Sequence, residues 1–224
     1  MNRARPILLL AGLLAGLCTG APANAGDTDA VITQHTLPLP GAMLAYSAET
    51  GRIAIRDVET GEPHGYMFYT AYRVPARDGK ARPVTFVWNG GPGANSSLLH
   101  FHVAGPRIVR GDRLVDNPES WLAFSDLVMV DPIGTGFSRP ARPEFGAEFY
   151  GTRGDVASVA EFVRSWLLLH DAEGAPLYLV GESWGAGRAA SVGYALQWLC
   201  AATLVWRWPT ADATPRQVNR PDAS

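Results

Sequence analysis

The spacing of apolar residues changes about a third of the way along the chain and divides it into two parts. From Val31 to Arg73, short segments of alternating and aromatic residues are separated by glycine and charged residues, which predicts antiparallel strands. Three later segments are short and continuously apolar: Pro83–Trp88, Leu127–Val130 and Leu177–Val180. Runs of this kind are typical of strands that are buried on both faces of a parallel sheet.

Turn signals and helical spacing complete the expected architecture. Ala42–Ser47 and Arg52–Asp57 are predicted to form a hairpin across Glu49–Gly51, because a glycine in a short connection readily takes a positive φ. Asp155–His170 has apolar residues at helical spacing, and Ala186–Leu199 follows the last buried strand as a second helix. The predicted fold class is therefore α/β, with an antiparallel β lead-in followed by a parallel sheet with flanking helices.

Composition restricts the class of protein. The 224 residues are 47% hydrophobic and 18% charged, which is typical of a globular chain and excludes wholesale disorder. The formal net charge of −2 offers no electrostatic basis for binding nucleic acid or an anionic membrane surface. We expect no metal ion or cofactor, and the oligomeric state stays open.

The N-terminal segment, residues 1–25, is typical of a secretory signal peptide. A start with two arginines precedes the apolar run Ile7–Leu17, and the small-residue site Ala23–Ala25 ends the segment. The alternative is an N-terminal anchor that is not cleaved. Cleavage predicts a periplasmic or secreted protein that keeps no membrane segment.

The rest of the chain is expected to hold one domain and a tail. Residues 26–200 carry the predicted strands and helices, whereas residues 201–224 are predicted to be a disordered tail because the periodicity of the preceding elements is lost. Removal of the signal peptide takes Cys18 with it and leaves Cys200 as the single cysteine. The exported chain would therefore fold without an internal disulfide.

The segment Gly181–Gly185 reads Gly-Glu-Ser-Trp-Gly and matches the G-x-S-x-G pattern of a nucleophile elbow. It follows the buried run Leu177–Val180 and precedes a predicted helix, which is the strand-turn-helix context that the pattern requires. Glycines are needed there because side chains would collide with the neighbouring backbone in so tight a turn. We expect Ser183 to be a nucleophile, and a purely structural turn is the alternative.

Two further segments follow the other buried strands. Asn89–Ser97 contains consecutive glycines whose backbone N–H groups suit an oxyanion hole, with a phosphate-binding loop or a plain glycine-proline turn as alternatives. Asp131–Ser138 is the second glycine-containing segment. Because the carboxyl ends of parallel strands share one edge of the sheet, all three segments are expected to meet in one site.

These segments, in this order, resemble the motifs of the serine carboxypeptidase family of α/β-hydrolases. The resemblance extends from about Tyr66 to about Ala190. Four parts of the family pattern are matched: the Trp-x-Asn-Gly-Gly-Pro-Gly region by Trp88–Ser97, Asn-Pro-x-Ser-Trp by Asn117–Trp121, the glycine-rich segment by Asp131–Ser138, and Gly-Glu-Ser-Tyr-Gly by Gly181–Gly185.

The resemblance implies an activity and a set of site residues. It implies hydrolysis of the C-terminal peptide bond of a peptide with a free C-terminus, through an acyl-enzyme on Ser183. Gly91 and Trp184 would supply the N–H groups of the oxyanion hole. Asn89 and Glu182 would bind the C-terminal carboxylate of the substrate.

The order of catalytic residue types departs from the family. In α/β-hydrolases the serine is followed along the chain by an aspartate and then a histidine. Here all five histidines precede Ser183: His35, His64, His100, His102 and His170. His100 and His102 are expected to be solvated or on a helix surface rather than to be substitute bases. We therefore expect the domain to be partial and truncated after the elbow, with an unpaired strand edge at that point.

Three functions stay open. The leading one is a serine-type carboxypeptidase, either active or inactivated by the lack of the downstream aspartate and histidine that the family uses. The second is an esterase or acyltransferase on the same scaffold, because acyl chemistry does not determine the leaving group. The third is a fragment without catalytic activity.

Overall fold

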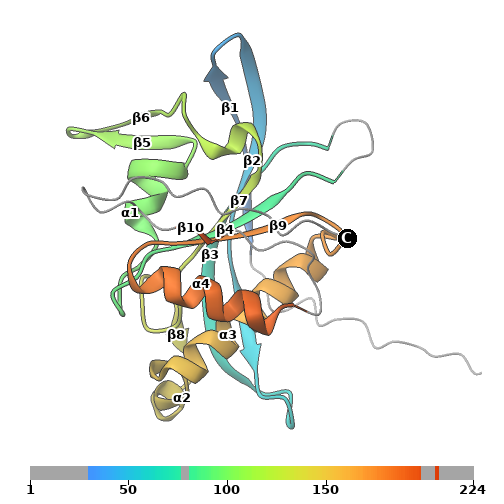
Figure 1. Ribbon diagram of the computed structural model, residues 1–224, viewed down its shortest axis with the longest axis vertical. Coiled ribbons are helices and arrows are strands. Elements are labelled where there is room, and N and C mark those ends of the chain that lie inside the picture. The colour runs from blue at the N-terminus through green and yellow to red at the C-terminus, as the bar shows by residue number, and fades with distance from the viewer. Residues whose placement is uncertain (1–29, 77–80, 198–204, 207–224) are drawn as a thin grey trace, which may run out of the picture.

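A mixed sheet forms the centre of the computed structural model, which describes residues 30–76, 81–197 and 205–206 (Figure 1). Across the sheet the strands lie in the order β1-β2-β3-β7-β4-β9-β10, and β8 pairs with β3. Their bounds are β1 Val31–Leu39, β2 Ala42–Arg56, β3 Pro63–Arg73, β4 Val84–Trp88, β7 Asp126–Val130, β8 Arg139–Pro140, β9 Leu177–Gly181 and β10 Val205–Trp206.

The directions of the strands confirm the predicted architecture. The pairs β1·β2, β2·β3 and β3·β7 are antiparallel, whereas β7·β4, β4·β9 and β9·β10 are parallel. β4 and β7 are buried along their whole length, as their largely apolar sequences predict. The two polar residues in them, Thr85 and Asp126, form hydrogen bonds with Ser125 and Arg82. The carboxyl ends of β4, β7 and β9 consequently meet at one edge of the sheet, which we call the carboxyl edge.

Helices and a small hairpin cover the sheet. The α-helices are α1 Ser97–Leu99, α2 Gly146–Tyr150, α3 Thr152–Leu169 and α4 Trp184–Ala195, and α1 continues into the π-helix η1 His100–Ala104. Two 3₁₀ turns are η2 Trp121–Ala123 and η3 Pro143–Phe145, and the separate hairpin pairs β5 Arg107–Arg110 with β6 Arg113–Asp116. Figure 1 shows α3 and α4 together on one side of the sheet, away from α1 and the β5–β6 hairpin.

The core has one layer on each face of the sheet. Alternate residues of β4 enter different clusters: Phe86 packs with Phe162 and Trp166 of α3, whereas Val87 packs on the opposite face with Leu99 of α1. The edge-to-face contacts of Phe86 with these two aromatic rings have centroid distances of 6.2 and 5.4 Å. Among the described residues, no helix is long and apolar enough to cross a membrane.

The hairpin predicted across Glu49–Gly51 is wrong. β2 runs without interruption through these residues, and the connection from β1 to β2 lies instead around Gly41, where φ is +78°. Gly51 pairs with Tyr69 inside the sheet. A Cβ at Gly51 would lie only 3.1 Å from the Tyr69 hydroxyl, so this glycine permits a close approach rather than a turn.

β9 is not the unpaired edge strand that the sequence predicts. Val205 and Trp206 form β10, which pairs in parallel with Leu179 and Val180. The N–H and C=O groups of an uncovered strand readily bind another extended segment, and β10 fills that position over two residues. The proposed signal peptide and Cys200 lie outside the described residues, and so does the predicted tail of residues 201–224 apart from Val205 and Trp206.

A buried polar cluster joins β2 and β3 to the end of α3. Glu49 is 7% exposed, accepts a hydrogen bond from the hydroxyl of Tyr69, and lies 3.0 Å from His170 Nε2. His170 Nδ1 lies 2.8 Å from the carbonyl oxygen of Trp166. Burial by itself would raise the pKa of Glu49, but the hydrogen bonds from His170 and Tyr69 hold that pKa below its ordinary value.

This cluster predicts a pH-dependent contribution to stability. Because the pKa of Glu49 is lower in the folded state, its contribution is present above the ordinary value of 4.5 and is lost as the pH falls through the folded-state value. Replacement of Glu49 by glutamine should reduce the free energy of unfolding at pH 7 by about 2 kcal/mol. Urea denaturation at pH 7 and pH 3 measures both effects, and the difference between wild type and variant should shrink at pH 3.

The matched control is Glu59→Gln, which changes an exposed carboxylate in the turn after β2. It should leave the free energy of unfolding within about 0.5 kcal/mol of wild type at both pH values. A difference between wild type and Glu49→Gln that stays constant from pH 7 to pH 3 would contradict the assigned pKa direction.

Candidate active site

Ser183 lies in a sharp turn between β9 and α4. Its backbone has φ +54° and ψ −124°, and its side chain is exposed. Only one other non-glycine residue among those described, Asp171, has a positive φ. Serine adopts this conformation at a cost in free energy, and backbone strain of this kind is typical of the nucleophile elbow.

Two glycines make room for the turn. A Cβ on Gly181 would lie 1.9 Å from the carbonyl oxygen of Gly185, within the turn itself. A Cβ on Gly185 would lie 3.0 Å from the carbonyl oxygen of Asn89, in the loop after β4. The G-x-S-x-G spacing therefore reflects one contact inside the elbow and one contact with a neighbouring loop.

The glycine-rich loop after β4 lies directly against the elbow. A Cβ on Gly90 would lie 2.5 Å from the carbonyl oxygen of Glu182 and 2.7 Å from the backbone nitrogen of Trp184. The next residue, Gly91, has φ +107°. Trp184 is the first residue of α4, and its side chain is 42% exposed. The structure thus brings the two predicted oxyanion-hole residues, Gly91 and Trp184, to adjacent stretches of backbone beside Ser183.

The third predicted segment is joined to the same loop by Asp131. Asp131 Oδ1 accepts hydrogen bonds from the backbone nitrogen and the hydroxyl of Ser96, at 2.9 and 2.8 Å. The other carboxylate oxygen accepts from the backbone nitrogen of Phe137. All three motif segments therefore meet at the carboxyl edge of the sheet, as predicted.

A cavity of about 450 Å³ opens beside the elbow at this edge. Its lining includes Pro92, Ile133, Tyr150, Trp184, Asp155 and Arg188. Most of these side chains are apolar or aromatic, and the two charged ones form an ion pair with each other. The cavity can accordingly hold an apolar group beside Trp184, the residue that follows Ser183 in the chain.

The two residues predicted to bind a substrate carboxylate differ in their exposure. Asn89 is only 1% exposed, and its side-chain oxygen accepts a hydrogen bond from the backbone nitrogen of Leu99 at 3.2 Å. Glu182 is half-buried and directly precedes Ser183. Glu182 is thus the more accessible of the two, whereas Asn89 lies within the base of the glycine loop, and neither residue belongs to the lining of the cavity.

The histidines have partners away from the elbow. His64 lies 2.8 Å from the Glu148 carboxylate, His170 contacts Glu49, and His35 lies 2.7 Å from the Thr33 hydroxyl. His102 is exposed on η1, as predicted. Among the described residues, no histidine forms a hydrogen bond with Ser183. The same part of the chain contains no group of three or more His, Cys, Asp or Glu side chains that could hold a metal ion.

The expectation that His100 lies on a helix surface is wrong. It is 6% exposed, its Nε2 lies 2.6 Å from the hydroxyl of Tyr72, and its ring stacks on Phe101. Burial lowers the pKa of His100 to about 4, so the ring is neutral at pH 7. η1 turns His100 toward the sheet through a π-helical turn, which the sequence does not indicate.

The motif Asn117–Trp121 binds the backbone at the end of η1. The side-chain amide of Asn117 donates to the carbonyl oxygens of Val103 and Gly105, at 3.0 and 2.9 Å. The hydroxyl of Ser120 donates to the carbonyl oxygen of Ala104. These bonds satisfy acceptors at the end of η1 that have no partner within the helix.

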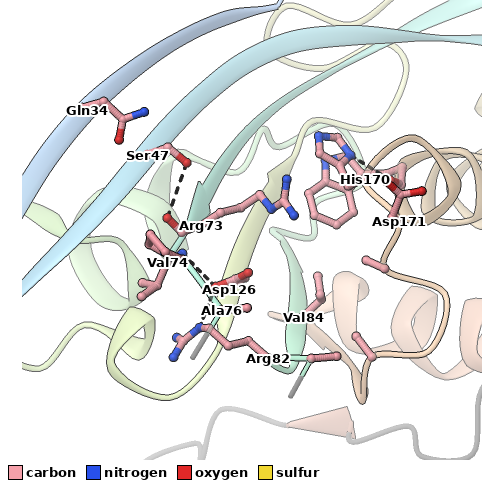
Figure 2. A pocket seen from close by; sticks show the side chains of 15 residues that line it. Gln34, Ser47, Arg73, Val74, Ala76, Arg82, Val84, Asp126, His170 and Asp171 are labelled. Carbon is pink, nitrogen blue, oxygen red and sulfur yellow. Dashed lines mark hydrogen bonds and ion pairs between the residues drawn. The ribbon is translucent and has the colours of Figure 1, made fainter. Parts of the chain in front are cut away.

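A second cavity, of about 380 Å³, lies at the opposite edge of the sheet (Figure 2). Arg82 and Asp126 form an ion pair on its lining, with Arg82 Nε 2.9 Å from Asp126 Oδ1. Val84 and Asp126 are the first residues of β4 and β7, so this cavity lies at the amino ends of the parallel strands. It is separated from Ser183 by the length of these strands and takes no part in the elbow.

Sequence comparison with known families identifies one matching profile. Residues 44–190 match the profile of the family described as serine carboxypeptidase. This segment contains the four motifs and all the predicted site residues.

Individual relatives resemble the same part of the chain. The pheromone-processing carboxypeptidase KEX1 of Verticillium alfalfae is 35% identical over 133 residues, which cover 58% of this chain and 20% of the relative. The human retinoid-inducible serine carboxypeptidase is 28% identical over 165 residues, covering 70% of this chain and 34% of the relative. The chain therefore spans only about a fifth to a third of the length of these proteins.

Comparison with solved structures supports the fold. The crystal structure of Kex1(delta)p, a prohormone-processing carboxypeptidase from Saccharomyces cerevisiae, superimposes with a TM-score of 0.58 at 23% identity. The match covers 67% of this chain and 34% of the yeast protein. The chain accordingly has part of the α/β-hydrolase fold.

Proposed function

The chain belongs to the serine carboxypeptidase family, and we propose that Ser183 is the nucleophile of a hydrolase acting on the C-terminal bond of peptides. The observation that carries the proposal is the exposed serine with φ +54° at the end of β9, against the loop that contains Gly90 and Gly91. A strained turn of this kind lifts the hydroxyl away from the backbone and places it next to N–H donors.

The proposed chemistry is acyl transfer. The Ser183 oxygen attacks the carbonyl carbon of the last peptide bond, and the oxyanion that forms accepts hydrogen bonds from the N–H groups of Gly91 and Trp184. The leaving amine takes up the proton that the Ser183 hydroxyl loses and departs as the released C-terminal residue. Water then hydrolyses the acyl-enzyme, which leaves the shortened peptide as a carboxylic acid and returns a proton to the Ser183 oxygen. Asn89, at the base of the glycine loop, and Glu182 would bind the free carboxylate, and Glu182 would do so as a carboxylic acid, because only the protonated form has a hydrogen to donate. Because none of the described histidines contacts Ser183, its general base is not among them.

The substrate and location follow from the same proposal. A peptide with a free C-terminus is the proposed partner, and the apolar cavity beside Trp184 would take the side chain next to the cleaved bond. Residues 1–25 are proposed to direct the protein to the periplasm or outside the cell. An esterase remains the second candidate, because the elbow and the glycine loop serve any acyl group.

The deciding experiment compares three substrates of the purified chain: a peptide with a free C-terminus, the same peptide with a C-terminal amide, and a simple aryl ester. We expect release of C-terminal residues from the free peptide only, and inhibition of this release by a fluorophosphonate. Mass spectrometry detects the released residue and the labelled serine.

Each of the other outcomes identifies a different function. Ester hydrolysis without release of C-terminal residues would favour the esterase. A chain that is folded by circular dichroism yet neither turns over nor labels would favour the fragment without catalytic activity.

A further inference from the structure

Arg188 lies at the centre of a buried bridge between three elements. It is 4% exposed on α4, and its Nε lies 2.7 Å from Asp155 Oδ2 near the start of α3. Its Nη1 donates to the backbone carbonyl oxygen of Asn89 at 3.0 Å. One guanidinium thus ties α4, α3 and the loop after β4 together, and sequence reasoning did not identify either charged residue.

The acceptor of this bridge is the carbonyl group next to the proposed oxyanion hole. Asn89 immediately precedes Gly90, whose Cα approaches the elbow so closely that a Cβ would lie 2.7 Å from the nitrogen of Trp184. A shift of the Asn89 peptide would therefore move the N–H groups of the following glycines relative to Ser183.

A second hydrogen bond joins the same two segments. The indole Nε1 of Trp88 donates to the carbonyl oxygen of Gly185 at 2.9 Å. Two side chains therefore connect these segments. Trp88, at the end of β4, donates to a backbone carbonyl of the elbow, and Arg188, on α4, donates to a backbone carbonyl of the glycine loop. Asp131 attaches the far end of the loop through Ser96.

We propose that Arg188, oriented by Asp155, is a positioning residue that fixes the glycine loop against the nucleophile elbow. This inference rests on the proposed role of Ser183. The planar guanidinium is suited to the task because it can bind a carboxylate and a carbonyl at once with fixed geometry. Lysine has a single ammonium group on a flexible chain and can keep the ion pair with Asp155 without holding Asn89.

The chain offers a matched control at the other edge of the sheet. Arg82 also bridges an aspartate and a backbone carbonyl. Its Nε lies 2.9 Å from Asp126 Oδ1 (Figure 2), and its Nη2 donates to the carbonyl oxygen of Leu122 at 2.8 Å. Arg82→Lys and Arg188→Lys therefore remove the same kind of interaction, but only the second does so beside Ser183.

The test measures the kinetics of phosphonylation of Ser183 by a fluorophosphonate in wild type and both variants. Arg188→Lys should lower the first-order rate constant of the covalent step at least about tenfold. The reason is that misplaced N–H donors of the glycine loop stabilise the transition state less well. The fluorophosphonate concentration that gives half of the maximal labelling rate should stay unchanged. Arg82→Lys should label at the wild-type rate. Equal rates in all three proteins, or equal losses in both variants, would overturn the proposal.

Amide hydrogen exchange of residues 89–95 measures the mobility of the glycine loop and does not require Ser183 to react with the probe. Exchange in this loop should accelerate in Arg188→Lys and stay unchanged in Arg82→Lys, and the absence of a selective acceleration would overturn the proposal. If wild type does not label at all, the proposed nucleophile fails for this chain, and exchange still decides whether Arg188 holds the loop.

Discussion

Replacement of Ser183 by alanine should abolish fluorophosphonate labelling and reduce any peptide hydrolysis by the chain to the uncatalysed background. The expected loss is this large because the variant removes the only atom that forms the acyl-enzyme. The Ser183 side chain is exposed and forms no hydrogen bond among the described residues, so the fold should be retained. Mass spectrometry of the labelled protein and near-UV circular dichroism measure the two effects separately.

Replacement of the same residue by glycine separates the chemistry from the strain of the elbow. Both Ser183→Ala and Ser183→Gly lack the hydroxyl, but only glycine adopts φ +54° without steric cost. Ser183→Gly should therefore be more stable than Ser183→Ala by about 1 kcal/mol in urea denaturation. Labelling of either variant would show that another residue is the nucleophile, and a glycine variant less stable than the alanine variant would contradict the strained turn.

Replacement of Gly181 by alanine should disrupt the elbow itself. The added Cβ would lie 1.9 Å from the carbonyl oxygen and 2.1 Å from the carbonyl carbon of Gly185, and both atoms belong to the backbone of the turn. Because no side-chain rotation can relieve this collision, the turn must open. We expect a loss of about 3 kcal/mol in the free energy of unfolding, together with loss of labelling at Ser183.

Gly187→Ala provides the comparison. Gly187 lies in the first turns of α4, and a Cβ there would meet no atom within 4 Å. Alanine favours a helix over glycine, so this variant should label normally and gain up to about 1 kcal/mol in stability. Normal labelling of Gly181→Ala would show that the turn tolerates the side chain and would contradict the close packing of the elbow.

Features that depend on neighbouring residues in the chain were predicted correctly. The continuous apolar runs indicated β4, β7 and β9, because a strand buried on both faces needs apolar residues at every position. The G-x-S-x-G spacing indicated the elbow, because its main steric contact, between Gly181 and Gly185, lies within five residues. The shared carboxyl edge followed from the parallel direction of the strands.

Features that depend on distant partners were predicted wrongly or missed. Gly51 resembles a turn glycine in the sequence, and only its pairing with Tyr69 shows that it lies inside a strand. The sequence around His100 does not show which side of the helix faces the sheet, and the packing of η1 against the sheet buries this residue.

The fold class, the position of the elbow and the resemblance to the family can all be recognised in the amino-acid sequence. How the glycine loop is held against the elbow becomes apparent only in the folded protein. Arg188 lies 33 residues from Asp155 and 99 residues from Asn89 along the chain. A buried guanidinium needs partners on several elements at once, and such partners have no fixed spacing in a sequence, so this bridge becomes visible only when α3, α4 and β4 are packed together.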